Sequence, residues 1–560
     1  MVERSGAQIV IDNLVAHGVD RIFQVPGESF LAVLDALHDR NDIQIITCRH
    51  EAGAANMAEA TGKITGRPGV CFVTRGPGSG HAAVAVQTAF QDSTPMILFV
   101  GQVGLADLGR EAFQEVDLHA MFGWTAKFAG NIPSVERIPE YVGRAFSLAQ
   151  SGRPGPVVLG LPEEIQEQRA DVADSSPALV AEPSPSPEER VRLARLLTEA
   201  KRPLMIVGGS RWTQEACDQA VAFAERHGIP VAVTFRRQDH FDNSSVCYIG
   251  DLAFALDPGL AQTFREADCI LAVGTRLGDL ASGGYGLLGI PSPGKTLIHV
   301  YPEPGELGRV FRPDLAIAAS PVSLCNALAA FDIDEASLEA AWLEAARARY
   351  LASIEPVSVV GDIDMRAVIA TLEMRLGVAG VITSDAGNFA QWAQRFFPFR
   401  KLGTQIAPRS GAMGYGLPSA IAAKLLHPDR PVVGLIGDGG FLMSSSELAT
   451  AVQHGVAPVL IVFNNGIFGT IRAHQERRFP GRVVGTDLRN PDFSAVASAF
   501  GAWSARVSRT EQFADALDQA MAAGRAAVIE IMLDPEAISV GRSLSQIREA
   551  AITGRTGKPV

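Results

Sequence analysis

The sequence lacks the features of membrane and secreted proteins. It contains no uninterrupted apolar run of about 18 residues, the length that a membrane-spanning helix needs. Its first residues, Met1 to Ser5, do not begin a basic segment followed by an apolar core, so a signal peptide is not predicted. We therefore expect a cytoplasmic protein with no membrane partner.

Paired cysteines are missing as well. None of the six cysteines stands at the C-x-x-C spacing of a zinc site, and most lie in apolar, strand-like runs. Buried free thiols are therefore expected, and neither a zinc site nor a disulfide framework is. The cysteines are Cys48, Cys71, Cys217, Cys247, Cys269 and Cys325.

The chain has fewer basic than acidic residues. It contains 49 Lys and Arg and 61 Asp and Glu, so its net charge is −12. A broadly acidic chain is a poor match for a phosphate backbone, so nucleic acid is not expected as the main partner. Apolar residues make up 47% of the 560 residues. That share is enough to bury several cores and argues against disorder.

Short apolar runs alternate with helical stretches along the whole chain. Continuous apolar strands separated by helices are typical of parallel sheets covered on both faces. We therefore predict an α/β fold of three doubly wound parallel-sheet domains. The predicted strands include Ile43–Thr47, Val70–Thr74, Met96–Val100, Leu204–Val207, Ile229–Thr234, Cys269–Val273, Val432–Ile436 and Val459–Phe463.

Two breaks divide the chain. Residues 171–190 are rich in Pro, Ser and acidic residues, which is a linker composition. A softer break lies between about 333 and 360. The predicted domains are 1–170, 188–335 and 355–545, followed by a tail at 546–560, and the first and third have a similar strand rhythm.

The third domain carries the richest motif. One buried strand ends in Gly437–Gly440 and the next ends in Asn464–Gly466, with 24 residues between Gly439 and Asn464. An Asp and an Asn thus follow two strands of one βαβ unit, at the edge where parallel sheets bind ligands. Either turn alone is an ordinary turn signal. Together they predict a site for Mg²⁺, which prefers carboxylate and amide oxygens, and for a diphosphate that the glycines let the backbone approach.

Between these turns, Ser444 and Glu447 stand at capping-box spacing and predict the start of a helix.

Gly437-Asp438-Gly439, the 24-residue spacing and Asn464-Asn465 resemble the binding motif of the thiamine diphosphate-dependent enzyme family. The resemblance implies that Asp438, the Asn465 side chain and the Ile467 carbonyl hold Mg²⁺, and that the bulky Met413 bends the cofactor. The implied cofactor-binding positions are Gly27, Glu51, Gly387, Asn388, Gly411, Met413, Gly437, Asp438, Gly439, Gly440, Asn465, Ile467 and Phe468.

Glu51 lies at a strand-to-helix turn of the first domain, where a glutamate is also favoured by the helix dipole alone. The resemblance implies that Glu51 bonds the aminopyrimidine ring and promotes loss of the thiazolium proton. The cofactor then attacks a 2-oxo acid and accepts the electrons released when CO₂ leaves. In this family Glu51 and Asp438 would come from different subunits, so a homodimer or homotetramer is implied.

Within the family the chain resembles the acetolactate synthase branch over almost its whole length. The resemblance is carried by Phe23–Gly27, Glu111–Asp117 and Gly152–Val157. It implies that Phe113 and Gln114 face the reacting carbons.

Two histidines are candidates for proton relay near neutral pH. His81 ends the glycine-rich turn Gly76–His81, and His474 follows the Mg²⁺ loop.

Several positions depart from the synthase pattern. Glu163 replaces a lysine, His474 replaces a tryptophan, Glu28 replaces a small residue, and Asn388-Phe389 replaces a Gln-His pair. These changes indicate a diverged paralogue with another acyl donor or acceptor.

The middle domain gives a weaker signal. Val273–Asp279 resembles a flavin-contacting strand end but lacks its charged continuation, and Gly208–Ser210 is not a dinucleotide fingerprint. FAD binding is left open.

Three functions stay open. The first is a decarboxylating carboligase that joins a 2-oxo acid to a second carbonyl. The second is a decarboxylase or carbon–carbon lyase with the same cofactor, and the third is a non-catalytic cofactor-binding regulator. Retention of Glu51 weighs against the third.

Overall fold

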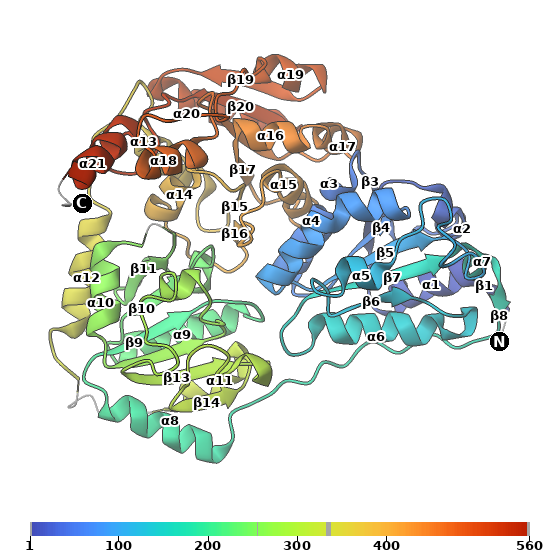
Figure 1. Cartoon of the computed structure of the whole chain (residues 1–560), viewed down its shortest axis with the longest axis horizontal. Coiled ribbons are helices and arrows are strands. Elements are labelled where there is room, and N and C mark those ends of the chain that lie inside the picture. The colour runs from blue at the N-terminus through green and yellow to red at the C-terminus, as the bar shows by residue number, and fades with distance from the viewer. Residues whose placement is uncertain (1–2, 255, 332–337, 557–560) are drawn as a thin grey trace.

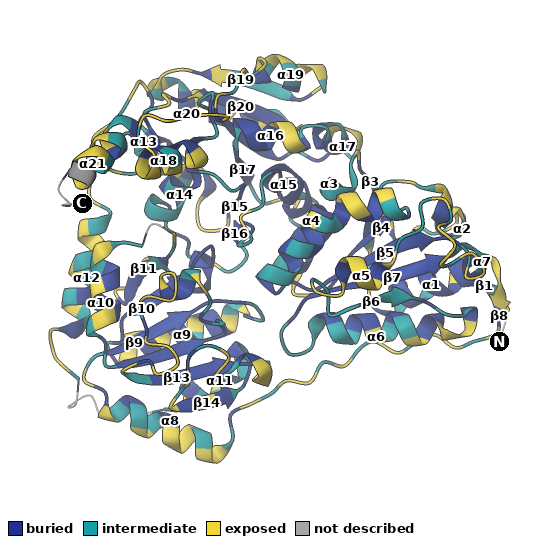
Figure 2. Cartoon of the chain, in the orientation of Figure 1, coloured by how far each residue is buried: buried dark blue, intermediate teal, exposed yellow. Residues whose placement is uncertain are grey.

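The computed structural model describes residues 3–254, 256–331 and 338–556. Three sheets of six strands each form its framework, and every pairing within them is parallel (Figure 1). Helices pack around each sheet, and the strands are buried (Figure 2). The predicted class of three parallel-sheet α/β domains is confirmed. No helix in the described part is both long and apolar enough to cross a membrane.

The first domain has the strand order β3-β2-β4-β5-β7-β6. All residues of β4, β5 and β7 are buried, which explains their continuous apolar sequences. Its strands are β2 (Arg21–Gln24), β3 (Gln44–Thr47), β4 (Gly69–Val73), β5 (Met96–Gln102), β6 (Phe128–Asn131) and β7 (Pro156–Pro162). Its helices are α1 (Gly6–Ala16), α2 (Leu31–His38), α3 (Glu51–Thr65), α4 (Gly76–Asp92), α5 (Leu118–Phe122), α6 (Ile138–Gln150) and α7 (Glu163–Glu167). A short antiparallel ribbon joins β1 (Arg4–Ser5) to β8 (Arg169–Ala170).

Residues 171–186 form neither helix nor strand and lead to the middle domain, as expected for a linker (Figure 1). The middle sheet has the order β11-β10-β9-β12-β13-β14. Its strands are β9 (Pro203–Val207), β10 (Val231–Thr234), β11 (Tyr248–Leu252), β12 (Cys269–Val273), β13 (Thr296–Tyr301) and β14 (Leu315–Ala318). Its helices are α8 (Pro187–Glu199), α9 (Gln214–Arg226), α10 (Pro258–Glu266), α11 (Pro321–Leu328) and α12 (Trp342–Ser353).

The third domain has the order β16-β15-β17-β18-β20-β19. Its strands are β15 (Val381–Ser384), β16 (Gln405–Ile406), β17 (Val432–Gly437), β18 (Val459–Asn464), β19 (Trp503–Val507) and β20 (Ala527–Met532). Its helices are α13 (Met365–Leu376), α14 (Ala390–Phe396), α15 (Gly416–Leu426), α16 (Asp438–Ser444), α17 (Glu447–Gln453), α18 (Gly469–Arg478), α19 (Phe493–Ala499), α20 (Phe513–Ala522) and α21 (Leu544–Thr556).

The first and third sheets share one topology. Numbered within its own domain, each has the strand order 2-1-3-4-6-5, whereas the middle sheet has 3-2-1-4-5-6. The similar strand rhythm seen in the sequence therefore corresponds to the same architecture. In sheets of this kind, ligands bind at the carboxyl ends of the strands where the winding direction reverses. These switch points lie between β2 and β4 and between β15 and β17.

Two segments differ from the expected domain boundaries. Helix α12 lies beyond residue 335, yet it packs on the middle domain, where Trp342 Nε1 donates to Pro203 O at 2.8 Å. Residues 546–554, expected as a tail, form most of α21 and pack on α18. There Ile547 is buried and Arg548 pairs with the buried Glu476. Residues 557–560 of the expected tail lie outside the described residues.

Contacts between α3 and α15 join the first domain to the third. Ala54 and Ala58 of α3 share one buried apolar cluster with Leu417 and Ala420 of α15. Tyr415 adds a polar contact, since its hydroxyl donates to the buried Glu59 at 2.6 Å. The six cysteines are free and buried, as expected.

Candidate functional site

Asp438 lies at the switch point of the third sheet. It follows the end of β17 and is the first residue of α16, with a side chain that is 4% exposed. Its carboxylate accepts hydrogen bonds from the backbone N–H of Gly439 at 2.8 Å and of Gly466 at 2.9 Å. Gly466 belongs to the turn after β18, so the structure brings the two predicted turns together.

Asn465 follows the last residue of β18 and precedes Gly466, whose N–H donates to Asp438. Its Oδ1 accepts a hydrogen bond from the N–H of Ile467 at 3.2 Å. Ile467 is buried, and the N–H of Phe468 donates to Thr486 O at 2.9 Å. The three predicted Mg²⁺ residues therefore lie in one turn and one helix start at the same sheet edge.

Asn490 is a site residue that the sequence did not indicate. Its Nδ2 donates to Asp438 Oδ2 at 2.8 Å and to Asn464 Oδ1 at 2.9 Å. Asn464 in turn donates to the buried Glu530 at 2.8 Å. An Asn-Pro step is a common loop signal, so nothing local marks Asn490 as a partner of Asp438.

The environment of Asp438 suits a divalent cation. Burial raises the pKa of its carboxyl group, and N–H donors from Gly439, Asn490 and Gly466 counteract the rise. Among the described residues, no Lys or Arg forms an ion pair with it. A buried carboxylate with only neutral partners is costly unless a cation offsets the charge. The donor set of carboxylate, amide and backbone oxygens therefore fits Mg²⁺.

Glycines around this edge allow close packing. A Cβ on Gly440 would lie 2.0 Å from Asp385 Oδ2, and one on Gly439 would lie 2.6 Å from Phe468 Cε1. Gly387 and Gly437 both pack on the ring of Phe389, at 2.2 Å and 2.9 Å from a hypothetical Cβ.

The predicted cofactor positions Gly411 and Met413 are more open than Asn388. Gly411 has a φ of +74° and no atom within 4 Å of a hypothetical Cβ, and Met413 nearby is half-buried. Asn388 is 7% exposed, and its Nδ2 donor has no partner among the described residues. An orphaned buried N–H of this kind fits a phosphate oxygen.

Asp385 fastens the loop that leads into α15. Its carboxylate accepts hydrogen bonds from the N–H of Gly416 at 2.5 Å and of Gly414 at 3.1 Å. Burial raises the pKa of Asp385 to about 6, while the backbone donors and the nearby Arg236 counteract the rise.

The predicted capping box at Ser444 and Glu447 is wrong. No side chain caps α17, and Ser444 Oγ has no partner among the described residues. The buried Glu447 carboxylate instead accepts hydrogen bonds from the N–H of His50 at 2.9 Å and of Arg49 at 3.2 Å, in the first domain. Glu447 thus supports the turn that presents Glu51, a contact between domains that local spacing cannot indicate.

Glu51 is the first residue of α3, and His50 caps the helix through its Nδ1, which accepts from Ala52 N at 3.1 Å. Glu51 Oε2 lies 2.8 Å from His81 Nδ1, and the rings of His50 and His81 stack with centroids 4.5 Å apart. The structure therefore joins His81 to Glu51, as a relay would require. It records no contact between Glu51 and Asp438 within the described part of this single chain.

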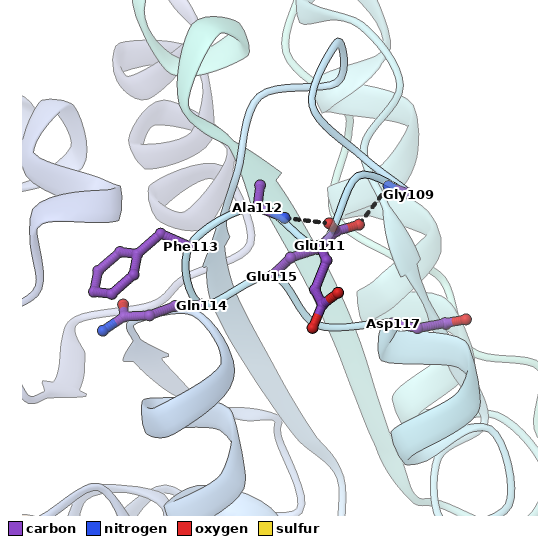
Figure 3. Close-up of a pocket in the computed structure, with 7 residues that line it drawn as sticks. All are labelled: Gly109, Glu111, Ala112, Phe113, Gln114, Glu115 and Asp117. Carbon is purple, nitrogen blue, oxygen red and sulfur yellow. Dashed lines mark hydrogen bonds between the residues drawn. The ribbon is translucent and has the colours of Figure 1, made fainter.

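Phe113 and Gln114 lie in the loop between β5 and α5, beside an open depression of about 580 Å³ (Figure 3). The two side chains project from the same side of the loop in Figure 3, and Phe113 is 73% exposed. Glu115 holds the loop together by accepting from the N–H of Gly109 at 2.6 Å and of Ala112 at 3.0 Å. These backbone donors keep the pKa of Glu115 below its usual value.

Gly27 lies at the switch point of the first sheet, where a Cβ would come within 2.5 Å of Thr74 Cβ. His474 is exposed on α18, and its ring lies 3.2 Å from Arg477 Nη1. The structure thus gives His474 no link to the Glu51–His81 pair within the described residues.

The switch point of the middle sheet, between β9 and β12, is filled by the chain itself. A Cβ on Gly209 would lie 1.7 Å from Gly274 O, and Trp212 Nε1 donates to Gly208 O at 2.8 Å. Arg276, just past β12, donates to Gln91 O of the first domain at 2.8 Å. Whether this domain binds FAD stays open.

Three family models match the chain in the order of its domains. They are described as the N-terminal TPP binding domain, the central domain and the C-terminal TPP binding domain of thiamine pyrophosphate enzymes. They match residues 4–121, 191–328 and 385–531.

Similarity to individual proteins extends over nearly the whole chain. A probable acetolactate synthase large subunit of Methanocaldococcus jannaschii is 30% identical, covering 99% of this chain and 97% of that protein. The acetolactate synthase large subunit of Corynebacterium glutamicum is 29% identical over 98% of this chain and 90% of its own length. The acetolactate synthase isozyme 3 large subunit of Escherichia coli is 30% identical over 92% of each.

Proposed function

Because this chain belongs to the thiamine pyrophosphate enzyme family, on the branch of the acetolactate synthase large subunits, we propose that it is a decarboxylating carboligase of 2-oxo acids that uses thiamine diphosphate and Mg²⁺. The chain is a thiamine diphosphate-dependent enzyme, so the non-catalytic regulator is not retained. The observation that carries the proposal is the full-length similarity to acetolactate synthases combined with the Glu51–His81 pair.

In this proposal the third domain holds the cofactor's diphosphate end. Asp438, the Asn465 side chain and the Ile467 carbonyl hold Mg²⁺, and Asn490 fixes the orientation of the Asp438 carboxylate by a hydrogen bond of 2.8 Å. The glycines of the β17 turn and the loops at Gly387–Asn388, Gly411–Met413 and Phe468 surround the phosphates and the ring system. The start of α16 favours their negative charge.

The first domain provides the acid–base groups. Thiamine diphosphate, when bound, supplies the carbon nucleophile and the electron sink for cleavage of the 2-oxo acid. Glu51 holds a proton at its carboxyl group against the aminopyrimidine ring. His81 Nδ1, 2.8 Å from Glu51 Oε2, exchanges that proton with the open side of the site. Phe113 and Gln114 exclude water and orient the second carbonyl.

The assembly is part of the proposal. Glu51 and Asp438 would meet across two subunits, so we propose a homodimer as the minimal active form, or a homotetramer built from it. The cytoplasmic location stays a prediction, and FAD binding stays open.

The test is product analysis with a panel of 2-oxo acids. Purified chain is incubated with pyruvate, 2-oxobutyrate or phenylpyruvate, with and without thiamine diphosphate and Mg²⁺, and all products are identified by mass spectrometry. A cofactor-dependent carboligation product supports the proposal. Free aldehyde as the sole product would replace it with a decarboxylase, and no consumption of any 2-oxo acid by cofactor-loaded protein would contradict both.

A further inference from the structure

The loop that carries Phe113 and Gln114 is fastened at both ends by the first turn of α7. Glu163 and Glu164 open this helix directly after β7. Glu164 Oε1 accepts a hydrogen bond from the N–H of Leu105, at the start of the loop, at 2.5 Å. Glu163 pairs with Arg75, whose Nη1 donates to Phe113 O at 3.4 Å near the end of the loop.

Arg75 is a buried charge with few partners. It lies at the N-cap of α4, is 8% exposed, and its Nε has no partner among the described residues. Glu163 forms the close ion pair, and Glu28 lies farther away at 3.8 Å. A buried guanidinium that loses its partner is strongly destabilised, so Glu163 keeps Arg75 in place beneath the loop.

The loop needs such support because its backbone is strained. Glu111 and Gln114 have φ values of +57° and +63°, in the left-handed region that favours glycine. Such residues persist only where the surroundings hold them. Next to Arg75, the N–H of Gly76 donates to Gln114 O at 2.9 Å. Two consecutive residues of the β4–α4 turn therefore hold the two consecutive carbonyls of Phe113 and Gln114.

We infer that the Arg75–Glu163 ion pair is a positioning element that fixes the Phe113–Gln114 turn and thereby favours carboligation over release of an aldehyde. This inference rests on the proposed function. Neither residue needs to touch the substrate, because both act through the shape of the loop.

The two outcomes differ in what bonds to the donor's carbonyl carbon. In both, the bond between the carboxylate and this carbon breaks, CO₂ leaves, and the electron pair stays on the carbon. In carboligation the pair forms a bond to the acceptor's carbonyl carbon, and the acceptor's oxygen takes up a proton. In aldehyde release the pair takes up the proton directly. A misplaced Phe113–Gln114 turn binds the acceptor less tightly and admits water. Aldehyde release then increases relative to carboligation.

The experiment compares three variants of the full chain with a matched control. Glu163→Gln removes the negative charge of the pair. Arg75→Lys keeps the positive charge but lacks the second guanidinium nitrogen, so it cannot contact both Glu163 and Phe113 O. The double variant Arg75→Met with Glu163→Leu removes both charges and so avoids an unpaired buried ion. Glu140→Gln breaks the exposed Arg137–Glu140 pair of α6 in the same domain and serves as control.

Each protein is loaded with thiamine diphosphate and Mg²⁺ and given the 2-oxo acid that the wild type consumes. We expect the ratio of aldehyde to carboligation product to rise about tenfold in Glu163→Gln and in the double variant. Arg75→Lys should show an intermediate rise, and Glu140→Gln none. The KM of the acceptor should rise while cofactor affinity stays unchanged. An unchanged product ratio in both charge-removing variants would overturn the inference and leave the proposed function standing.

Hydrogen exchange provides a readout that does not depend on turnover. The amides of residues 105–117 and of Gly76 should exchange faster in Glu163→Gln and in the double variant than in Glu140→Gln. Equal exchange would overturn the inference even if the wild type consumed no 2-oxo acid.

Discussion

At the residue scale, the two acidic residues of the proposed site, Asp438 and Glu51, lie in different electrostatic environments. Asp438 is a buried carboxylate surrounded by neutral N–H donors, which suits it to a cation. Glu51 lies at a helix start with His81 as its neighbour at 2.8 Å, which suits it to proton transfer. Each residue can therefore be tested by an amide substitution, which keeps the shape of the side chain and removes its carboxyl group.

Glu51→Gln keeps the size of the side chain but removes the carboxyl group. We expect turnover to fall by at least about a hundredfold, because the general acid–base group is lost. Binding of thiamine diphosphate, followed by calorimetry in the presence of Mg²⁺, should change little. Turnover equal to that of the wild type would refute the assigned role.

The two candidate histidines are expected to behave differently now that their surroundings are known. His81→Ala should lower turnover about tenfold or more without changing cofactor affinity, because His81 contacts Glu51. His474→Ala is the matched comparison, since the contact recorded for His474 is with Arg477 on its own helix. Steady-state kinetics near neutral pH distinguishes them. A full loss in His474→Ala with no loss in His81→Ala would reverse the assignment.

At the element scale, the carboxyl ends of the parallel strands determine where the candidate site residues lie. Strands β5, β12, β17 and β18 were predictable to within a few residues, because strands buried on both faces have continuous apolar sequences. The shared edge of Asp438 and Asn465 was predictable too, since both follow neighbouring parallel strands.

Contacts between distant elements were not predictable. The pair Arg75–Glu163 spans 88 residues, the bond from Arg49 to Glu447 spans 398, and that from Asn490 to Asn464 spans 26. Sequence spacing reports neighbours on one helix or strand, whereas these partners meet only after the sheets have formed. The failed capping box has the same cause, because Glu447 finds its partners in another domain.

Asp385, which directly follows β15, predicts a pH dependence of stability. Burial raises the folded-state pKa of Asp385 from 3.8 to about 6, so the folded chain binds more protons than the unfolded chain between these values. The free energy of unfolding should therefore fall as pH rises from about 4 to about 6, by at most about 3 kcal/mol from this group.

Asp385→Asn provides the measurement. Relative to this variant, cofactor-free wild type should lose stability over that pH window in urea titrations. A difference between the two proteins that stays constant with pH would contradict the assigned environment of Asp385.

At the scale of the whole molecule, two domains of the same topology would provide the complementary halves of the proposed site. The first sheet positions Glu51 and the third positions Asp438, and no contact joins these two residues within the described part of one chain. In a homodimer each half would meet the other half from its partner.

Mixing two inactive variants tests this arrangement. Glu51→Gln and Asp438→Asn chains, unfolded or dissociated and reassembled together, should form mixed dimers with one intact site. Statistical mixing predicts recovery of about one quarter of wild-type activity. Each variant reassembled alone is the control, and no recovery in mixtures shown to contain mixed dimers would place both residues in one chain's site.

Carbon balance during turnover tests decarboxylating carboligation most directly. Wild-type protein loaded with thiamine diphosphate and Mg²⁺ is given the ¹³C-labelled 2-oxo acid that it consumes, and CO₂ release, consumption of the 2-oxo acid and labelled products are measured together by NMR and gas analysis. We predict that one carboligation product forms for each CO₂ released and that the labelled acyl carbon in it is bonded to the carbon of a second carbonyl compound. One CO₂ for each 2-oxo acid, with the label in free aldehyde, would contradict carboligation.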